Sequence, residues 1–130
     1  MAIQRVGCTP CNGMQPSFGY SDKLKTLFKE GKLPSVIHDI AGKKLTPQNV
    51  TLDHVIPKCK GGLNKTENYM LATAEFNHAR GCRPLKEFLT KENLDKYIAQ
   101  FKDISVDGFE GNKYIKSLLE TLDKANKRGV

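Results

Sequence analysis

Two short strand-like stretches joined by a polar loop are the feature that most constrains how this chain can fold. Residues 50–56 and residues 69–73 each have the length and composition of a β-strand. The loop between them, PKCKGGLNKTEN, carries two adjacent glycines, which favour a sharp change of direction. Residues 75–80 then predict a helix that Gly81 ends. The sequence therefore predicts a strand, a loop, a strand and a helix in that order.

Helices are expected on both sides of this unit. Ser21 can cap a short helix over residues 22–30, and Thr90 and Asn112 can cap two later helices. The segment DISVDGFEG between those later helices is typical of a linker. Three apolar stripes at helical spacing are expected to pack into the core: Leu85, Phe88 and Leu89; Leu94, Tyr97, Ile98 and Phe101; and Ile115, Leu118, Leu119, Leu122 and Ala125.

These elements predict a single α+β domain over residues 1–130. Residues 1–20 are rich in glycine and proline and predict an irregular arm. Residues 33–89 hold the strand, loop, strand and helix that form the expected core. Residues 90–130 predict a mostly helical C-terminal extension that covers this core.

The net charge of +7 favours a polyanionic partner, because a basic surface that neutralises phosphates releases their counterions. The alternative is that basic charge only keeps the protein soluble. No apolar run approaches the roughly 20 residues that a membrane span needs, and the N-terminus lacks the long apolar stretch of a secretory signal. We therefore expect a cytoplasmic protein without a membrane partner.

The four cysteines are expected to be free thiols, because disulfides are rare in a reducing cytosol. Cys8 and Cys11 form a CxxC pair, which can be half of a zinc site. Cys59 and Cys82 lie far apart in the sequence and make no second CxxC. A structural zinc is therefore not expected, although a site built from all four cysteines stays open as an alternative.

The middle of the chain contains side chains suited to hydrolysing a phosphodiester. That reaction needs an activated water, charge stabilisation on the phosphate, and help for the leaving oxygen. His54 carries an imidazole, which can take a proton from water near neutral pH. Asp53 and Asn77 offer oxygen ligands for a divalent cation. Arg80 lies one helical turn beyond Asn77 and can meet a phosphate.

This segment resembles the HNH, or ββα-metal, endonucleases. In that family a strand ends in Asp-His or His-His, and a loop with Ile-Pro and Gly-Gly follows. An Asn precedes the second strand, and the helix carries Asn or His with Lys or Arg three residues later. The chain has these elements in the same order: Asp53-His54, Ile56-Pro57, Gly61-Gly62, Asn68, Asn77 and Arg80. The combination is specific, although it covers a minority of the chain.

The resemblance implies a ββα-metal core with flanking helices and a role for each matching residue. Asp53 and Asn77 resemble the ligands of a divalent cation, Mg²⁺ first, with Mn²⁺ or another transition metal as alternatives. His54 resembles the general base. Asn68 resembles the residue that tethers the loop and helps to hold the base. Arg80 resembles the cation beside the scissile phosphate.

Other basic residues near this segment are expected to line a track for the nucleic-acid backbone. They are Lys58, Lys60 and Lys65 in the loop and Arg83 after the helix. The alternative is that they form a solvated surface.

The chain departs from the family at the positions where many members hold a structural zinc with two CxxC pairs. Here these positions have His38 with Ala41, and Thr73 with Phe76. These residues cannot make a four-ligand zinc site, so His38 is expected to be a packing or surface residue.

Two pairs of neighbours raise a question of orientation. Asp53 and His54 point to opposite faces of a regular strand, so both reach one site only if the strand twists or ends there. Asn77 and His78 point about 100° apart on a helix. Because Arg80 shares a face with Asn77, we expect Asn77 to be the ligand and His78 to face solvent or nucleic acid.

The function that these observations predict is a metal-dependent DNA endonuclease that nicks one strand or, when paired, cuts both. Compact HNH proteins are frequent in bacteriophages and mobile elements, which would place this one in the host cell cytoplasm. RNA as the substrate, a homodimer and a larger phage or mobile-element complex stay open. The alternatives from other classes are a non-catalytic nucleic-acid-binding or assembly protein on the same scaffold, and a zinc-ribbon-like binding module.

Overall fold

A computed structural model describes residues 23–130 of the chain. The predicted arm, Ser21, Cys8 and Cys11 lie outside the described residues. In chain order, with η for a short 3-10 helix, the elements are α2 (Lys23–Lys29), β2 (Val50–His54), η1 (Lys58–Lys60), η2 (Thr66–Asn68), β3 (Tyr69–Thr73), α3 (Ala74–Arg80), η3 (Leu85–Glu87), α4 (Lys91–Ala99), β4 (Ser105–Val106), β5 (Phe109–Glu110) and α5 (Gly111–Arg128). The fold is α+β with a mostly helical C-terminal part, as the sequence predicts.

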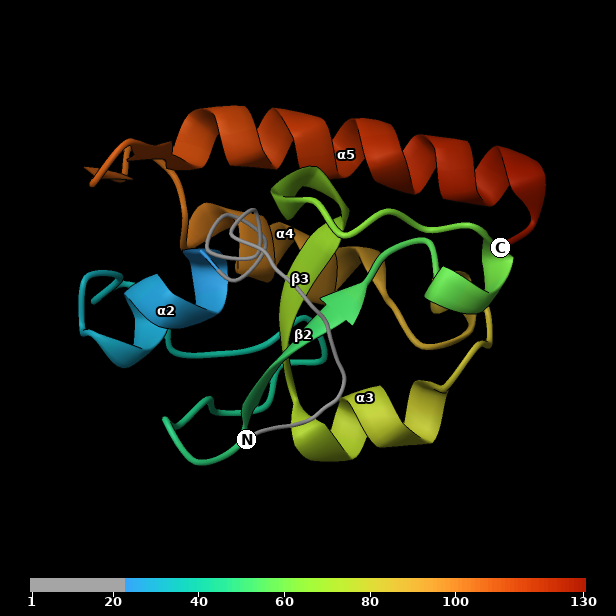
Figure 1. Ribbon diagram of the computed structural model, residues 1–130, viewed down its shortest axis with the longest axis horizontal. Helices are drawn as coiled ribbons and strands as arrows, with labels where there is room; N and C mark the ends of the chain where they lie inside the picture. Colours follow the sequence, from blue (N-terminus) through green and yellow to red (C-terminus); the bar gives the residue numbers. More distant parts are fainter. Residues whose placement is uncertain (1–22) are drawn as a thin grey trace, which may run out of the picture.

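The centre of the fold is the antiparallel pair of β2 and β3 (Figure 1). In the view of Figure 1, α5 runs along the top, α2 lies at the left and α3 lies below the strands. The register pairs Val50 with Thr73 and His54 with Tyr69. Every residue of β3 is buried, which explains why its sequence, YMLAT, lacks the alternation of a strand with one exposed face.

The first strand ends two residues earlier than the prediction of residues 50–56. Ile56 leaves the ladder because its N–H donates to the Asn68 side chain at 2.9 Å instead of to a strand partner. The second strand has the predicted bounds. The helix after it begins one residue earlier than expected, at Ala74, because the Thr73 hydroxyl caps it by accepting from the N–H of Phe76.

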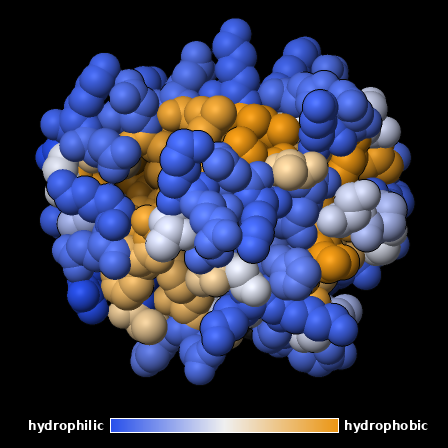
Figure 2. Space-filling view, turned by 180° about the vertical axis from the view of Figure 1, so that it is seen from behind, coloured by the Kyte–Doolittle hydropathy of each residue, from blue (hydrophilic) through white to orange (hydrophobic). Residues whose placement is uncertain are grey.

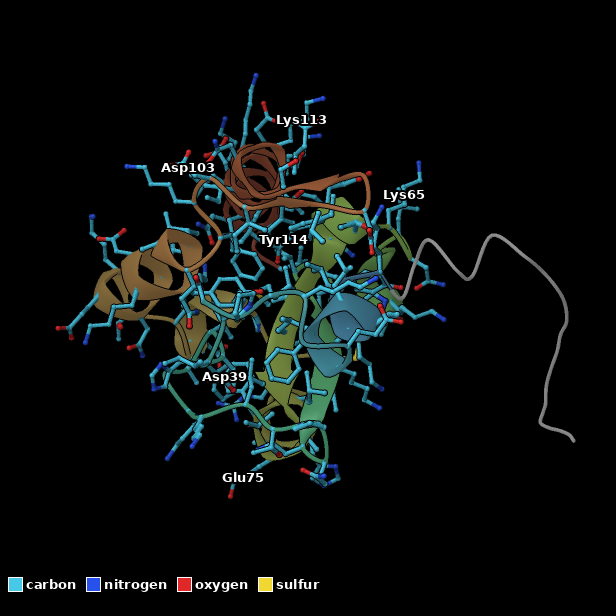
Figure 3. The ribbon with its side chains drawn as sticks, turned by 90° about the vertical axis from the view of Figure 1, so that its left-hand side faces the viewer. Asp39, Lys65, Glu75, Asp103, Lys113 and Tyr114 are labelled. Atoms are coloured by element: carbon cyan, nitrogen blue, oxygen red, sulfur yellow. A yellow bond between two sulfur atoms is a disulfide. The ribbon has the colours of Figure 1, made fainter. Side chains whose placement is uncertain are left out.

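The outer edge of β3 is satisfied by side chains instead of by a third strand. Two N–H groups on this edge donate to the Tyr97 hydroxyl at 2.8 Å and to the Asp39 carboxylate at 2.9 Å. The Tyr69 carbonyl accepts from the Tyr114 hydroxyl at 2.6 Å, and Figure 3 shows Tyr114 pointing from α5 toward the strands. Burial raises the pKa of both hydroxyls, so they stay protonated and can donate.

The outer edge of β2 is covered in the same way by α3. Asn77 Nδ2 donates to the Leu52 carbonyl at 3.1 Å, and the Arg80 guanidinium donates to the carbonyls of His54 and Val55. These bonds fix α3 against the strand that carries Asp53. They also supply partners for carbonyl groups that would otherwise be buried without one.

The C-terminal part differs from the prediction in two places. The stripe Leu85, Phe88 and Leu89 forms only the short helix η3 and its following residues, and not a full helix. The predicted linker contains the small hairpin of β4 and β5, with Asp107 and Gly108 at positive φ in its turn.

The last helix begins at Gly111 rather than after a cap by Asn112. The Asn112 side chain bonds to Asp103 instead, and a Cβ at Gly111 would lie 1.8 Å from the Phe101 carbonyl oxygen. The predicted cap at Thr90 is present, since its hydroxyl accepts from the N–H of Asn93 at 3.1 Å. The close approach at Gly111 fixes where α5 leaves the hairpin.

The buried face of α5 is turned slightly from the predicted stripe. Tyr114, Leu118, Leu122 and Ala125 are buried, whereas Leu119 is 40% exposed. Figure 2 shows hydrophilic residues projecting along the top of the molecule with hydrophobic residues beneath them. The helix is therefore amphipathic, with its apolar side on the strands. No helix between residues 23 and 130 is long and apolar enough to cross a bilayer.

Candidate active site

The predicted site residues gather where β2 meets α3. Asp53 Oδ2 accepts from Arg80 Nη1 at 3.1 Å, and Thr51 Oγ1 bonds Asn77 Nδ2 at 3.2 Å. Thr51 and Asp53 are two residues apart on one face of β2. Asn77 and Arg80 are three residues apart on one face of α3. The carboxylate, the amide and the guanidinium therefore lie along the contact between β2 and α3, which we call the seam.

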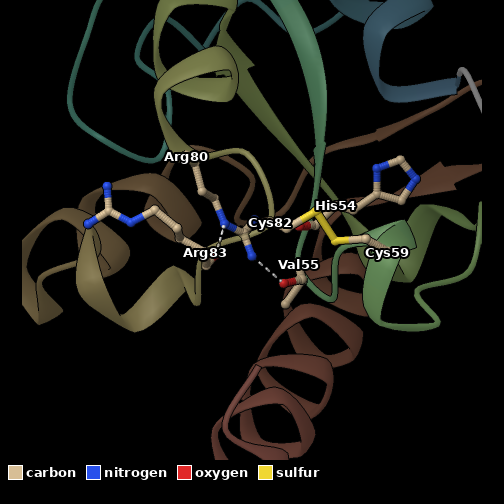
Figure 4. The surroundings of a disulfide bond; sticks show 6 residues. All are labelled: His54, Val55, Cys59, Arg80, Cys82 and Arg83. Atoms are coloured by element: carbon tan, nitrogen blue, oxygen red, sulfur yellow. Dashed lines mark hydrogen bonds between the residues drawn. A yellow bond between two sulfur atoms is a disulfide. The ribbon is translucent and has the colours of Figure 1, made fainter.

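Arg80 occupies a position in this seam that sequence reasoning did not predict. The residue is only 1% exposed. Its guanidinium contacts Asp53 and the carbonyls of His54 and Val55, and its Nε donates to the Arg83 carbonyl at 2.9 Å (Figure 4). The expected contact of Arg80 with a phosphate is therefore corrected: the side chain is buried as a structural cation that joins β2 to α3.

The charge of Asp53 is held in an unfavourable setting. Its carboxyl group is buried, and burial raises its pKa above the usual value. The Arg80 guanidinium lowers this pKa, and so does the more weakly acting His54 imidazole, but burial has the largest effect. A further positive charge beside the carboxylate would therefore stabilise its ionised form.

Asn77 is held so that its amide oxygen stays available. Its Nδ2 donates to Thr51 Oγ1 and to the Leu52 carbonyl, which uses both of its N–H groups. Within residues 23–130, no donor reaches its Oδ1. The neighbour His78 is exposed, as expected from its place on the helix. The structure thus orients Asn77 rather than His78 along the face that also carries Arg80.

His54 ends β2 with its ring on the other side of the strand from Arg80. The ring meets Tyr69 edge-on, with centroids 5.0 Å apart, and Nε2 lies 2.8 Å from Asn64 Oδ1. β2 does end at His54, but the imidazole lies across the strand from the Asp53–Arg80 pair.

Asn68 ties the loop into a fixed shape. Its Oδ1 accepts from the Ile56 N–H at 2.9 Å, and its Nδ2 donates to the carbonyls of Ile56 and Leu63 at 3.1 and 2.9 Å. The side chain is buried, so all of these bonds are shielded from water. These bonds tether the loop to the end of β2.

The two adjacent glycines of the loop are each needed for a different steric reason. Gly61 has φ +88° and ends η1 in the left-handed region. A Cβ at Gly62 would lie 1.7 Å from the Ile56 carbonyl oxygen. The loop can therefore fold back on the end of β2 only with these two residues.

Cys59 and Cys82 form a disulfide, so the prediction of free thiols is wrong for this pair. Their Cα atoms lie 6.4 Å apart, although 23 positions separate them in the sequence. The bond links η1 to the residues after α3, directly beside His54 and Arg80 (Figure 4). It therefore closes the loop onto the helix that carries Asn77.

Reduction of this disulfide is expected to lower the free energy of unfolding by about 3 kcal/mol, since a loop of this length loses that much closure entropy when it is cross-linked. Urea unfolding with and without a dithiol reductant measures the difference. The variant Cys59→Ser/Cys82→Ser should match the reduced protein. Overlapping curves for the oxidised and reduced protein would show that the bond does not constrain the unfolded chain.

The basic residues of the expected phosphate track divide into two groups. Lys58, Lys60 and Lys65 are exposed on the loop. Arg83 instead bonds Glu87 at 2.9 Å and lies 4.8 Å from the centroid of the Phe88 ring. Among the described residues the three lysines therefore have no ion-pair partner, whereas Arg83 has local partners.

Sequence reasoning missed three residues that hold this region in place, Asp39, Asn64 and Tyr114, and the role of the Tyr97 hydroxyl. Asp39, Tyr97 and Tyr114 cover β3, and Asn64 contacts the His54 ring. For Tyr97 and Tyr114, the only signal in the sequence was a hydroxyl group within an otherwise apolar helical stripe. His38, which sequence reasoning placed at a packing or surface position, is exposed.

Comparisons with known proteins give this site no further support. No protein-family model matches the chain. No curated protein matches its sequence.

Proposed function

We propose that the protein is a metal-dependent endonuclease that hydrolyses phosphodiester bonds in DNA. The observation that carries the proposal lies where α3 packs on β2. There, Asn77 presents an amide oxygen that no donor within residues 23–130 reaches, on the helix packed against the buried Asp53 carboxylate. His54 lies next in sequence, at the point where β2 ends. The resemblance to HNH endonucleases assigns chemistry to these same three residues.

The two oxygen donors fit a hard divalent cation such as Mg²⁺. Asn77 Oδ1 has no donor within the described residues, and the Asp53 carboxylate accepts from Arg80 through Oδ2 and from the backbone N–H of His54. A bound cation would stabilise charge on the phosphate and on the leaving oxygen. Residues 23–130 contain no cluster of three or more His, Cys, Asp or Glu side chains suited to a metal. A cation held by Asp53 and Asn77 alone would keep most of its coordination positions for water and substrate.

The protein side chains supply the remaining functions. His54 takes a proton from the attacking water, and Asn64 and Tyr69 hold its ring. Asn68 and the disulfide keep the loop closed around this imidazole. Arg80 holds Asp53 in place and partly offsets the cost of burying its charge.

A second candidate is a non-catalytic nucleic-acid-binding protein on the same scaffold. The observation that favours it is the buried ion pair of Asp53 and Arg80, which gives the carboxylate a structural role of its own. A binder of this kind would keep the basic loop and would not cleave. Cleavage of bound DNA therefore distinguishes the two functions.

Incubation of the purified protein with supercoiled plasmid distinguishes them. An endonuclease is expected to give relaxed or linear DNA with Mg²⁺ or Mn²⁺ and none with EDTA. A binder is expected to shift the plasmid on a gel without breaking it. DNA that stays supercoiled with every divalent metal tested would contradict the proposed function.

The variants Asn77→Ala and His78→Ala provide a matched test of the site, because the two residues are neighbours on α3 and only one faces the seam. Asn77→Ala is expected to raise the Mg²⁺ concentration needed for half-maximal nicking by about 10- to 100-fold, the range over which groups around a metal change its affinity. His78→Ala should keep the parent value. The reverse result would place the ligand one residue further along the helix.

A further inference from the structure

The C-terminal end of α5 joins the loop that carries the candidate site. Arg128 Nη2 donates to the Lys60 carbonyl at 2.9 Å, across 68 positions of sequence. Figure 1 shows this end of α5 beside the short helix of the loop. Lys58, Lys60, Lys124 and Arg128 are exposed in these two segments, and we call them the loop–α5 surface.

The positive charge of this surface is not neutralised by neighbouring carboxylates. Within residues 23–130, none of its four side chains has a carboxylate oxygen within the 4.0 Å of an ion pair. Elsewhere basic residues are often paired, as Lys91 is with Asp95 and Lys113 is with Glu110. The surface therefore has free charge for an external anion, whereas those residues have internal partners.

The surface adjoins the candidate site through the disulfide. Cys59 lies between Lys58 and Lys60 and is bonded to Cys82. Figure 4 places the His54 ring beside Cys59. A phosphate chain that passes His54 can therefore continue over η1 to the end of α5.

The exposed side chains favour a double helix over a single strand. Single-stranded nucleic acid is held by stacking its bases on aromatic rings, as well as by charge. The large apolar side chains exposed in residues 23–130 are Ile37, Leu63 and Leu119, and none of them is aromatic. The described surface thus offers charge for a duplex backbone without a platform for unpaired bases.

We propose that the loop–α5 surface binds the sugar–phosphate backbone of duplex DNA beyond the bond that is cut. The inference rests on the proposed function for the identity of the substrate, and it adds α5 to the part of the chain that holds it. Lys124 and Arg128 contact phosphates and not base edges, so they contribute affinity without sequence preference.

The test compares Lys124→Gln/Arg128→Gln with a control, Lys102→Gln/Lys116→Gln. The control removes the same charge from two exposed residues that also lack a carboxylate partner within residues 23–130. Fluorescence anisotropy with a labelled DNA duplex in EDTA measures binding without cleavage. Loss of two phosphate contacts is expected to lower the slope of log K against log salt by about 2 and to weaken binding by about 10- to 100-fold near 0.1 M salt.

The control variant should bind more tightly than the α5 variant and keep a salt slope close to that of the parent. Equal binding by the parent and the α5 variant would overturn the proposal, and so would equal affinity for a single strand of the same length. Lys58→Gln/Lys60→Gln tests the loop half of the surface if the α5 variant does not fold. Its parent-like binding would likewise overturn the proposal.

Failure of the proposed function gives a different result. If the parent protein binds the duplex through this surface but never nicks plasmid, the proposal for the loop–α5 surface stands and the proposed endonuclease function is wrong. If the parent nicks plasmid but Lys124→Gln/Arg128→Gln and Lys58→Gln/Lys60→Gln bind the duplex as the parent does, the endonuclease function stands and the proposal for the loop–α5 surface is wrong.

Discussion

Replacement of Arg80 by Met is expected to lower the free energy of unfolding by about 3 to 5 kcal/mol, the cost of leaving a buried charge without its partner. Met fills much of the volume but cannot neutralise Asp53 or donate to the carbonyls of His54 and Val55. Burial already raises the pKa of Asp53, so loss of the guanidinium should raise it further. Equilibrium unfolding in urea measures the change.

Arg83→Met is the matched control for this variant. Arg83 lies three positions away and also bonds a carboxylate, but its side chain is 62% exposed. Exposed ion pairs contribute little, so this substitution should cost less than about 1 kcal/mol. Equal stability losses for the two variants would show that Arg80 is not the buried connector between β2 and α3.

Replacement of His54 by Ala is expected to reduce the rate of plasmid nicking by about 10²- to 10⁴-fold, the usual contribution of a general base. The side chain packs edge-on against Tyr69 and, within residues 23–130, bonds Asn64 alone, so its loss should leave the strands in place. Duplex binding in EDTA should therefore stay near the parent value. The comparison of nicking rate with binding isolates the chemical step.

His38→Ala serves as the control because His38 is an exposed histidine in the segment before β2. It should retain the activity and stability of the parent. Activity of His54→Ala within tenfold of the parent would exclude this residue as the base. Loss of duplex binding to the same extent as nicking would indicate a structural role for His54 instead.

The strand–loop–strand–helix order was predictable because each element is encoded locally. Residues 69–73 are apolar and flanked by polar segments, and Thr73 supplies the cap that begins α3. The paired glycines were also visible, although their reason is steric contact with the end of β2. Local patterns of this kind do not depend on how distant segments pack.

The features that sequence reasoning missed all depend on tertiary packing. An arginine three residues after Asn77 shares its helical face, but the sequence does not say that this face turns toward the sheet and buries Arg80. The pairing of Cys59 with Cys82 likewise requires the loop to fold onto the end of α3. The apolar periodicity of α5 fixed its amphipathic character but not its rotation, so Tyr114 was missed and Leu119 was placed in the core.

The two covered edges of the central sheet limit how this protein can meet other chains. Asn77 and Arg80 occupy the outer edge of β2, while Asp39, Tyr97 and Tyr114 occupy that of β3. A peptide or a second copy therefore cannot extend this sheet by adding a strand, which is the usual route to edge-to-edge aggregation and to strand-addition complexes. Association through the β2–β3 pair is closed, and recognition by the described part of the chain falls to its helices and loops.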